Sequence, residues 1–476
     1  MVDAAVASRI RSPGPIPYAI LSAVALVSYS SWNRPLWYDE MVYFVLGGFD
    51  STADVFQVID QTTTNVNQGV TGAYMLVSFW SLELFGAHAW ALRLPSMLFA
   101  VYFFFTAALF LRGRGVGWWG VSALPVLLMG QESLMYYAGE ARTYMPLAAA
   151  TTGILAYYFI PISQRSRWGP RLLGWSAVLI GVLFHPYFAL YWPLVLVFAL
   201  TVTKQWRITI RFTNPVLVAV GTAVFFLVAA LTWLRGTAQT ETLDPYRWLG
   251  DSLFWAIPSK LGQFIYVQRP LIVASAVIIV LAVFLAVRKT GFGSVTAQWW
   301  PPLLLIAIAF VSSWILAGIS VMQGFWIIQR QWIASVALIS IAIIWFWSRA
   351  LASIRNSSGE KASNTVRIMV AGLLAVSAVS PLIRQTTSLL TWQDQAVEST
   401  AQQTADESAL ERELQRVRDG SRDPLTDDEW VDYSNANVLQ GGKVWDSFRH
   451  YYLNVDWSDF VIRDSSSSPT RVERLT

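Results

Sequence analysis

Long apolar runs constrain this chain more than any other feature, because about 20 apolar residues in a helix span the hydrocarbon core of a bilayer. Of its 476 residues, 55% are hydrophobic and only 13% are charged, about half the charged share of a typical soluble protein. Such a chain cannot cover a water-exposed surface, so we predict an all-α polytopic membrane protein. We expect eleven spans, at 16–32, 94–111, 116–131, 143–161, 172–184, 187–203, 215–234, 270–287, 299–320, 326–347 and 366–384.

The basic residues predict how these spans are oriented, because cytoplasmic loops carry an excess of Lys and Arg. A further apolar run, 70–86, is short and contains Ser78, Ser81 and Glu83. If this run crossed the membrane, the parity would break and the basic clusters would no longer all lie on one side. If it is a juxtamembrane helix, all the basic clusters lie on one side. We therefore predict a cytoplasmic N-terminus and a C-terminus outside.

The same segments divide the chain into two parts. Residues 1–390 form the transmembrane module, in which 33–93 is a first outer loop with interfacial helices and 235–269 is a second large outer loop. Residues 391–476 form a separate outer domain, because their composition changes sharply to polar and charged.

This outer domain is predicted to be small and of mixed α/β structure. Val397–Val417 has the pattern of an amphipathic, charge-laced helix, and Trp445–Ile462 carries short aromatic, β-prone runs. We expect its Ser-rich end to be frayed.

The acidic residues of the transmembrane module gather on one side of the predicted membrane. Of 30 Asp and Glu residues, 13 precede residue 391, and on the predicted topology only Asp3 and Glu360 among them are cytoplasmic. Charges at membrane depth are costly and usually functional. We infer an acid-lined outer vestibule, with solvated loop acids as the alternative.

The sharpest motif is Trp37-Tyr38-Asp39-Glu40, directly after the first predicted span. Two adjacent carboxylates cannot point the same way on a helix or strand, so one can act as a base while the other orients a partner or binds a metal. The alternative is a helix N-terminus, where acids favour the dipole. Which of Asp39 and Glu40 is the base stays open.

A second group of polar residues is expected at the outer ends of later spans. Glu140, Arg142 and Tyr144 enter an apolar helix, which indicates either substrate contact or a helix cap with a Glu–Arg ion pair. Arg93 either extends to lipid headgroups or holds the first loop in place. His185 faces the same compartment, as a ligand or metal contact or as a satisfied polar residue.

Three further cations are candidates for binding phosphate. Arg330 lies just inside a predicted span, where it needs an anionic partner. A lipid phosphate matches a guanidinium bidentately, and a vestibule acid is the alternative. Lys260 and Arg269 are secondary candidates on the second outer loop.

No cofactor is required by the sequence. With no Cys and three His, a zinc site is not expected. The oxygen ligands of Asp39 and Glu40 would suit a divalent cation such as Mg²⁺, Mn²⁺ or Ca²⁺, although nothing demands one.

The order of these motifs resembles the GT-C superfamily of membrane glycosyltransferases, in the branch of the protein O-mannosyltransferases and the lipid A aminoarabinose transferases. The resemblance spans roughly residues 15–350 and implies the GT-C fold, a polyprenyl-phosphate-linked sugar donor, an acceptor hydroxyl, membrane lipids as partners and a catalytic first-loop acid. It rests on the Trp-Tyr-Asp-Glu motif, Leu84-Phe85-Gly86, Arg93-Leu94-Pro95-Ser96, Tyr137–Tyr144 and Arg330.

Two departures from that family bear on the acceptor. The stretch Asn67–Tyr74 has no proline, where many relatives have Pro-Pro, and the tail lacks an MIR-type domain. The missing proline bears on the shape of the first outer loop and thus on the acceptor. The missing domain favours a bacterial inner-membrane enzyme of the cell envelope that acts on a glycolipid such as lipopolysaccharide, or on a glycan.

The resemblance predicts a single displacement at the anomeric carbon. Asp39 takes the acceptor proton, Glu40 orients the acceptor, and Arg330 and Arg142 stabilise the leaving phosphate. The alternatives are a protein O-glycosyltransferase, a lipid-sugar flippase or transporter, which should show inverted repeats or broken helices, and a non-catalytic export subunit.

The net charge of +4 fits cytoplasmic loops, so we expect no nucleic-acid partner.

Overall fold

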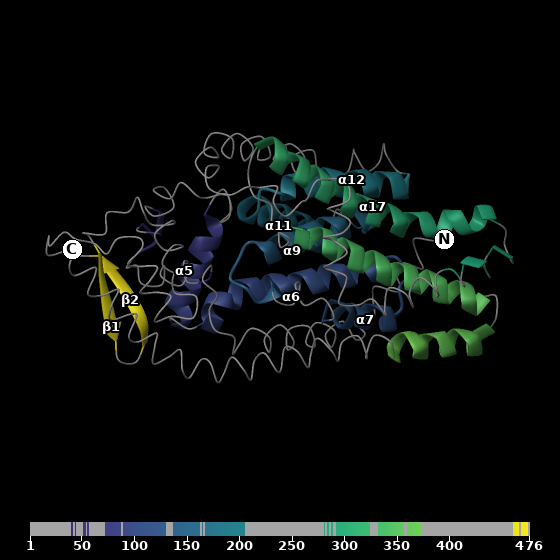
Figure 1. Ribbon diagram of the computed structural model, residues 1–476, viewed down its shortest axis with the longest axis horizontal. Helices are drawn as coiled ribbons and strands as arrows, with labels where there is room; N and C mark the ends of the chain where they lie inside the picture. Colours follow the sequence, from purple (N-terminus) through teal and green to yellow (C-terminus); the bar gives the residue numbers. More distant parts are fainter. Residues whose placement is uncertain are drawn as a thin grey trace.

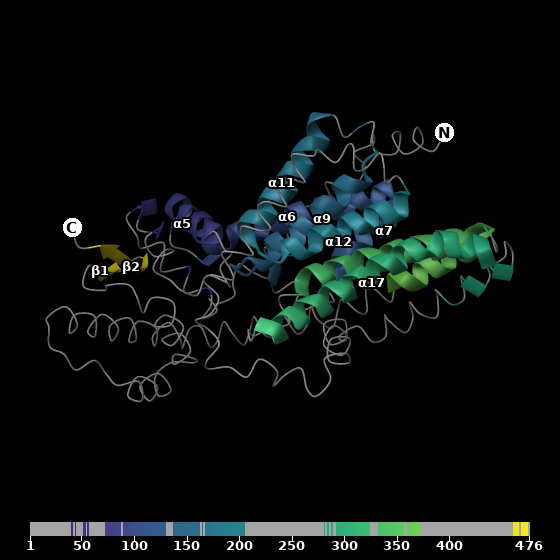
Figure 2. The same ribbon diagram turned by 90° about the horizontal axis from the view of Figure 1, so that it is seen from above.

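The computed structural model shows a bundle of long helices with a smaller group of elements at one end (Figures 1 and 2). The residues that the structure describes are 40, 43, 51–53, 55–56, 72–86, 89–129, 137–161, 164, 167–204, 280, 283–284, 287–288, 292–323, 332–356, 359–372, 460–465 and 468–474. Within these ranges, side chains are described except in 292–298, 319–323 and the two strands near the C-terminus.

The centre of the bundle is helix α9 (Tyr144–Phe159), in which every residue is buried. A helix that is apolar on all sides must be covered on all sides. Gly153 allows a close approach, since a Cβ there would lie 2.8 Å from Ala177 Cβ and 2.9 Å from the Tyr102 ring. The helices packed against α9 are α6 (Ala89–Gly113), α11 (Trp168–Phe184) and α12 (Phe188–Thr203).

A second layer of helices lies beside this group. Its helix α17 (Phe292–Gln323) packs against α12. The Tyr191 hydroxyl bonds to Ser335 Oγ at 2.8 Å, and Ser313 Oγ donates to the same oxygen at 2.9 Å. Such polar contacts hold helices together where lipid offers no hydrophobic driving force. The other helices of this side are α7 (Trp118–Met129), Ile333–Asn356 and 359–372.

Three of the described helices are long and apolar enough to cross a membrane: Trp90–Gly113, Trp299–Gly318 and Ile333–Asn356. A polytopic helical membrane protein is therefore confirmed, whereas the count of eleven spans stays a prediction. Helices occupy all or part of the expected spans at 94–111, 116–131, 143–161, 172–184, 187–203, 299–320, 326–347 and 366–384. The spans expected at 16–32 and 215–234, and most of 270–287, lie outside the described residues.

The ambiguous run 70–86 forms helix α5 (Ala73–Phe85), at the end of the bundle (Figure 1). It has 13 residues, so it rises about 20 Å, less than the roughly 30 Å of a hydrocarbon core. Gly72 and Gly86 flank it with φ of 65° and 83°, values that glycine adopts readily. The run therefore forms a short helix, as expected, and its juxtamembrane placement stays a prediction.

The segment Arg93-Leu94-Pro95-Ser96 fastens α5 to α6. Pro95 lies inside α6 and has no N–H, so the carbonyl of Ala91 loses its helical donor. The Ser81 hydroxyl of α5 donates to that carbonyl at 2.5 Å. Ser96 Oγ bonds to the Tyr74 hydroxyl of α5, also at 2.5 Å. The proline thus creates a docking point for α5.

We expect Ser81→Ala to destabilise the protein by about 1–3 kcal/mol, because the Ala91 carbonyl would be buried without a donor. In a Pro95→Ala background the cost should shrink, since the restored N–H of residue 95 can take over that carbonyl. Thermal unfolding of the purified protein in detergent measures both effects. An equal cost in the two backgrounds would contradict this account of the contact.

The described part of the tail is an antiparallel hairpin of β1 (Phe460–Ser465) and β2 (Ser468–Arg474), at the same end as α5 (Figures 1 and 2). Within the Ser-rich stretch, Ser465 pairs with Ser468, whereas residues 466–467 and 475–476 lie outside the described residues, so the frayed end stays a prediction. The β-branched residues Val461, Ile462, Thr470 and Val472 favour strands here despite the serines. The helix expected at Val397–Val417 and most of Trp445–Ile462 lie outside the described residues, so the α/β domain stays a prediction.

Candidate active site

A buried ion pair joins Glu40, from the segment that follows the first predicted span, to Arg93 of α6. Arg93 donates through Nε to Glu40 Oε1 at 2.9 Å and through Nη2 to Oε2 at 2.6 Å. This is the bidentate geometry in which a guanidinium matches a carboxylate best. The two side chains have no exposure to solvent. Arg93 thus binds the segment before α6 through Glu40, which is the second of the two arrangements expected for it.

The same carboxylate also binds the turn that precedes α9. The backbone N–H of Ala141 donates to Glu40 Oε1 at 2.9 Å. Negative charge is favourable beside a helix N-terminus, and α9 begins at Tyr144. Glu40 therefore connects segments that lie 53 and 101 residues away along the chain.

The turn before α9 brings two more charged side chains into the interior. Glu140 and Arg142 are 0% and 1% exposed. The guanidinium of Arg142 lies 5.4 Å from the centre of the Tyr43 ring, within the range of a cation–π contact. The backbone carbonyl of Arg142 accepts a hydrogen bond from Ser96 Oγ at 3.3 Å. The burial of two carboxylates and two guanidiniums at one end of the bundle marks a candidate active site, because buried charge is costly and is concentrated at functional sites.

Aromatic rings from several elements surround these charges. The ring of Tyr74 lies edge-on to Tyr43 at 5.4 Å and to Phe184 at 6.2 Å. Burial raises the pKa of Tyr74, and the nearby charges of Glu40 and Glu140 raise it further, although its hydrogen bond to Ser96 acts in the opposite direction. Tyr74 thus stays protonated beside both carboxylates.

His185 lies in the turn between α11 and α12, where it is 5% exposed. Its ring is 6.2 Å from that of Tyr144. The backbone N–H of Tyr187 donates to Nδ1 at 3.2 Å, so the neutral ring carries its proton on Nε2. Burial lowers the pKa of His185 to about 3. The residue is therefore a neutral donor at physiological pH.

This burial makes stability depend on pH. At pH values between the ordinary pKa of a histidine, about 6.5, and the lower pKa of His185 in the folded protein, this side chain binds a proton more tightly in the unfolded chain. The folded state therefore loses stability as the pH falls through this range. At about pH 5 the loss from His185 should be about 2 kcal/mol relative to pH 7.5. We expect His185→Gln to remove this part of the decline in thermal unfolding temperature. An equal decline in the variant and the parent would contradict the buried neutral state.

The structure brings together the described members of the predicted site at one end of the bundle. Tyr43, Tyr74 and Ser96 also contribute, although the sequence assigns none of them to the site. Tyr43 lies three residues after Glu40, a helical spacing that could have indicated a shared face. The predicted site residues that are described are Glu40, Arg93, Glu140, Arg142, Tyr144 and His185, whereas Asp39, Lys260, Arg269 and Arg330 lie outside the described residues.

Glu40 is poorly placed to bind a metal ion. Its carboxylate oxygens accept three hydrogen bonds from Arg93 and Ala141. Within the part of the chain that the structure describes, no three His, Asp or Glu side chains come together at a possible metal site. A cation at Glu40 would have to displace the Arg93 guanidinium.

The helical bundle and the buried charges near α5 define a polytopic helical membrane protein. The fold matches the crystal structure of ArnT from Cupriavidus metallidurans bound to undecaprenyl phosphate, with a TM-score of 0.50 and 16% identity over 83% of this chain and 80% of that chain. The resemblance expected from the sequence is confirmed at the level of the fold.

A second structure, ArnT from Cupriavidus metallidurans in the apo state, matches 72% of this chain and 77% of that chain, with a TM-score of 0.36 and 16% identity. No protein-family model and no curated protein sequence matches the chain.

Proposed function

We propose that this protein is an integral membrane glycosyltransferase. It moves a sugar from a polyprenyl-phosphate-linked donor to a hydroxyl of a glycolipid or cell-envelope glycan, at the outer face of the bacterial inner membrane. The observation that carries the proposal is the buried cluster around Glu40, Arg93 and Arg142, which adjoins Asp39 in the chain. The fold supports it, because the similar ArnT structure is bound to a polyprenyl phosphate.

The proposed reaction is a single displacement with Asp39 as the base. Asp39 accepts the proton of the acceptor hydroxyl while the acceptor oxygen forms a bond to the anomeric carbon. The bond between that carbon and the donor phosphate oxygen breaks, and its electron pair leaves with the phosphate. A singly charged phosphodiester thereby becomes a monoester that carries a second negative charge. Arg330 and Arg142 stabilise this additional charge.

We assign the base to Asp39 and a positioning role to Glu40. Both oxygens of Glu40 already accept hydrogen bonds from Arg93, and Oε1 also binds the Ala141 N–H. A carboxylate held in this way is poorly available to take a proton from a substrate. It holds the first outer loop against α6 and the turn before α9, so that the adjacent Asp39 reaches the acceptor. No step of this mechanism requires a divalent cation.

The test is transfer from a synthetic polyprenyl-phosphate sugar by the full-length protein in detergent micelles. Glycolipid, glycan and Ser/Thr-containing peptide acceptors are supplied separately, and products are identified by mass spectrometry. We expect release of polyprenyl phosphate together with a glycolipid or glycan heavier by one sugar. Modification of the peptide alone would assign protein O-glycosylation instead. Movement of intact donor between vesicle leaflets, without transfer, would support a flippase and overturn the proposal.

A further inference from the structure

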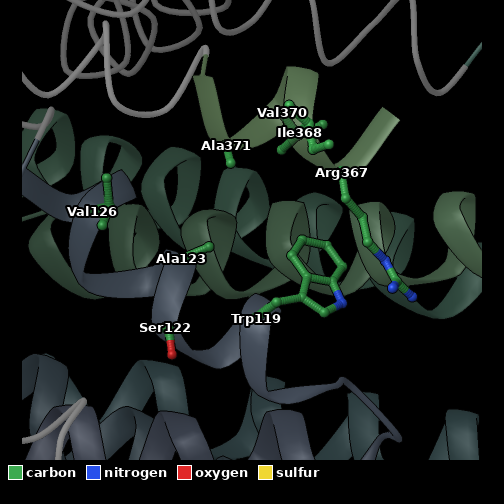
Figure 3. Close-up of a pocket in the computed structure, with 8 residues that line it drawn as sticks. All are labelled: Trp119, Ser122, Ala123, Val126, Arg367, Ile368, Val370 and Ala371. Carbon is green, nitrogen blue, oxygen red and sulfur yellow. The ribbon is translucent and has the colours of Figure 1, made fainter. Parts of the chain in front are cut away.

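A pocket lies between α7 and the helix 359–372, toward the end of the bundle opposite α5 (Figures 1 and 3). Its volume is about 420 Å³, within the usual range of small-molecule sites. Val126, Ile368 and Ala371 are among its apolar lining residues. The side chains of Trp119 and Arg367 converge on it from the two helices (Figure 3). The pocket thus combines an apolar wall with one cation.

The guanidinium of Arg367 is only partly satisfied by the described residues. Nη1 donates to Asn364 Oδ1 at 3.1 Å, in an exposed contact within the same helix. Nε is buried and has no hydrogen-bond partner among the described residues. A buried donor without an acceptor costs about 1–3 kcal/mol, and more when it is charged. An anionic oxygen in the pocket would remove this cost.

Two further arginines, Arg112 and Arg114, come shortly before α7 in the chain. The guanidinium of Arg112 lies 4.2 Å from the centre of the Trp118 ring, next to Trp119 in the chain. Burial and the nearby charge of Arg349 lower the pKa of Arg114 to about 10. Tryptophan with clustered arginine is typical of the membrane interface on the cytoplasmic side. Basic clusters at this level attract anionic lipids.

We propose that this pocket binds an anionic phospholipid of the cytoplasmic leaflet, with its phosphate on Arg367 and the start of one acyl chain along Val126 and Ala371. Guanidinium matches phosphate oxygens in geometry as well as in charge. The pocket is too small for two complete acyl chains, so the remainder of the lipid extends into the bilayer. The site is separate from the proposed sugar transfer and does not rest on it.

The experiment is native mass spectrometry of the full-length protein titrated with phosphatidylglycerol or phosphatidylcholine. We expect Arg367→Gln to weaken phosphatidylglycerol binding by about tenfold or more, the loss of a charge-assisted contact. Ala371→Phe should weaken it similarly by filling the pocket while leaving the arginine in place. The matched control is Arg355→Gln. Arg355 is exposed and does not line the pocket, so this substitution should leave binding unchanged. Phosphatidylcholine should bind more weakly and respond less to Arg367→Gln.

Three results would overturn the proposal. The first is parental affinity in both Arg367→Gln and Ala371→Phe, with each variant eluting as the same folded species. The second is competition by inorganic phosphate as effective as that of the lipid, which would define a free-anion site. The third is preferential binding of polyprenyl phosphate over phosphatidylglycerol, which would assign the pocket to the donor lipid.

Discussion

Replacing Asp39 by Asn should lower kcat for sugar transfer by about 10²- to 10⁴-fold, the usual contribution of a general base. The amide has nearly the same size and can still hydrogen-bond to the acceptor, but it cannot take up the proton. KM should therefore change much less than kcat. Initial rates of polyprenyl-phosphate release measure the effect directly.

The matched control for this variant is Glu83→Gln, which removes an exposed acid from α5. It should transfer sugar at the parental rate, because Glu83 lies on the outside of this helix. Arg330→Ala should also be slow, by about 10²- to 10³-fold, through loss of charge stabilisation on the leaving phosphate. Full activity of Asp39→Asn would sink the assignment of the base.

Breaking the Glu40–Arg93 pair should have the largest effect on stability. Removing one partner of a buried ion pair costs about 3–5 kcal/mol, because the other charge is left buried without compensation. We expect this loss in Glu40→Met and in Arg93→Met, measured by thermal unfolding in detergent. The double variant should be less destabilised than either single one, since two apolar side chains leave no buried charge behind.

Transfer activity separates positioning from mere stability in this series. If Glu40 and Arg93 hold the first outer loop, the double variant should regain thermal stability yet still transfer sugar slowly, because Asp39 has lost its fixed position. Recovery of both properties would mean that the pair serves stability alone. Additive losses in the double variant would show that the two side chains are not coupled.

Hydropathy located the helices well because the hydropathy of a segment depends only on its own residues and can be summed along the chain. The expected spans 143–161 and 187–203 correspond closely to α9 and α12. The start of α6 was placed too late, at residue 94, because Arg93 interrupts the apolar run. In the structure α6 begins at Ala89, since Glu40 compensates the charge of Arg93 inside the fold.

The candidate site was predicted as individual residues and not as an arrangement. Glu40 and Arg93 were both singled out, yet nothing in the sequence indicates that they pair. The contribution of Tyr74 and Ser96 was missed for the same reason, because their 2.5 Å contact joins two helices. The role of Pro95 became clear only with Ser81 beside the Ala91 carbonyl.

Sequence alone was sufficient for the class of molecule, a polytopic helical membrane protein with few charges, because transfer of apolar segments into a bilayer depends mainly on their own composition. A short helix in the run 70–86 was also expected and is present as α5, whereas its juxtamembrane placement stays a prediction. The pairing of charges did not follow, because Glu40 meets partners 53 and 101 residues away. Those contacts depend on how helices pack, and packing turned scattered acids and arginines into one buried cluster.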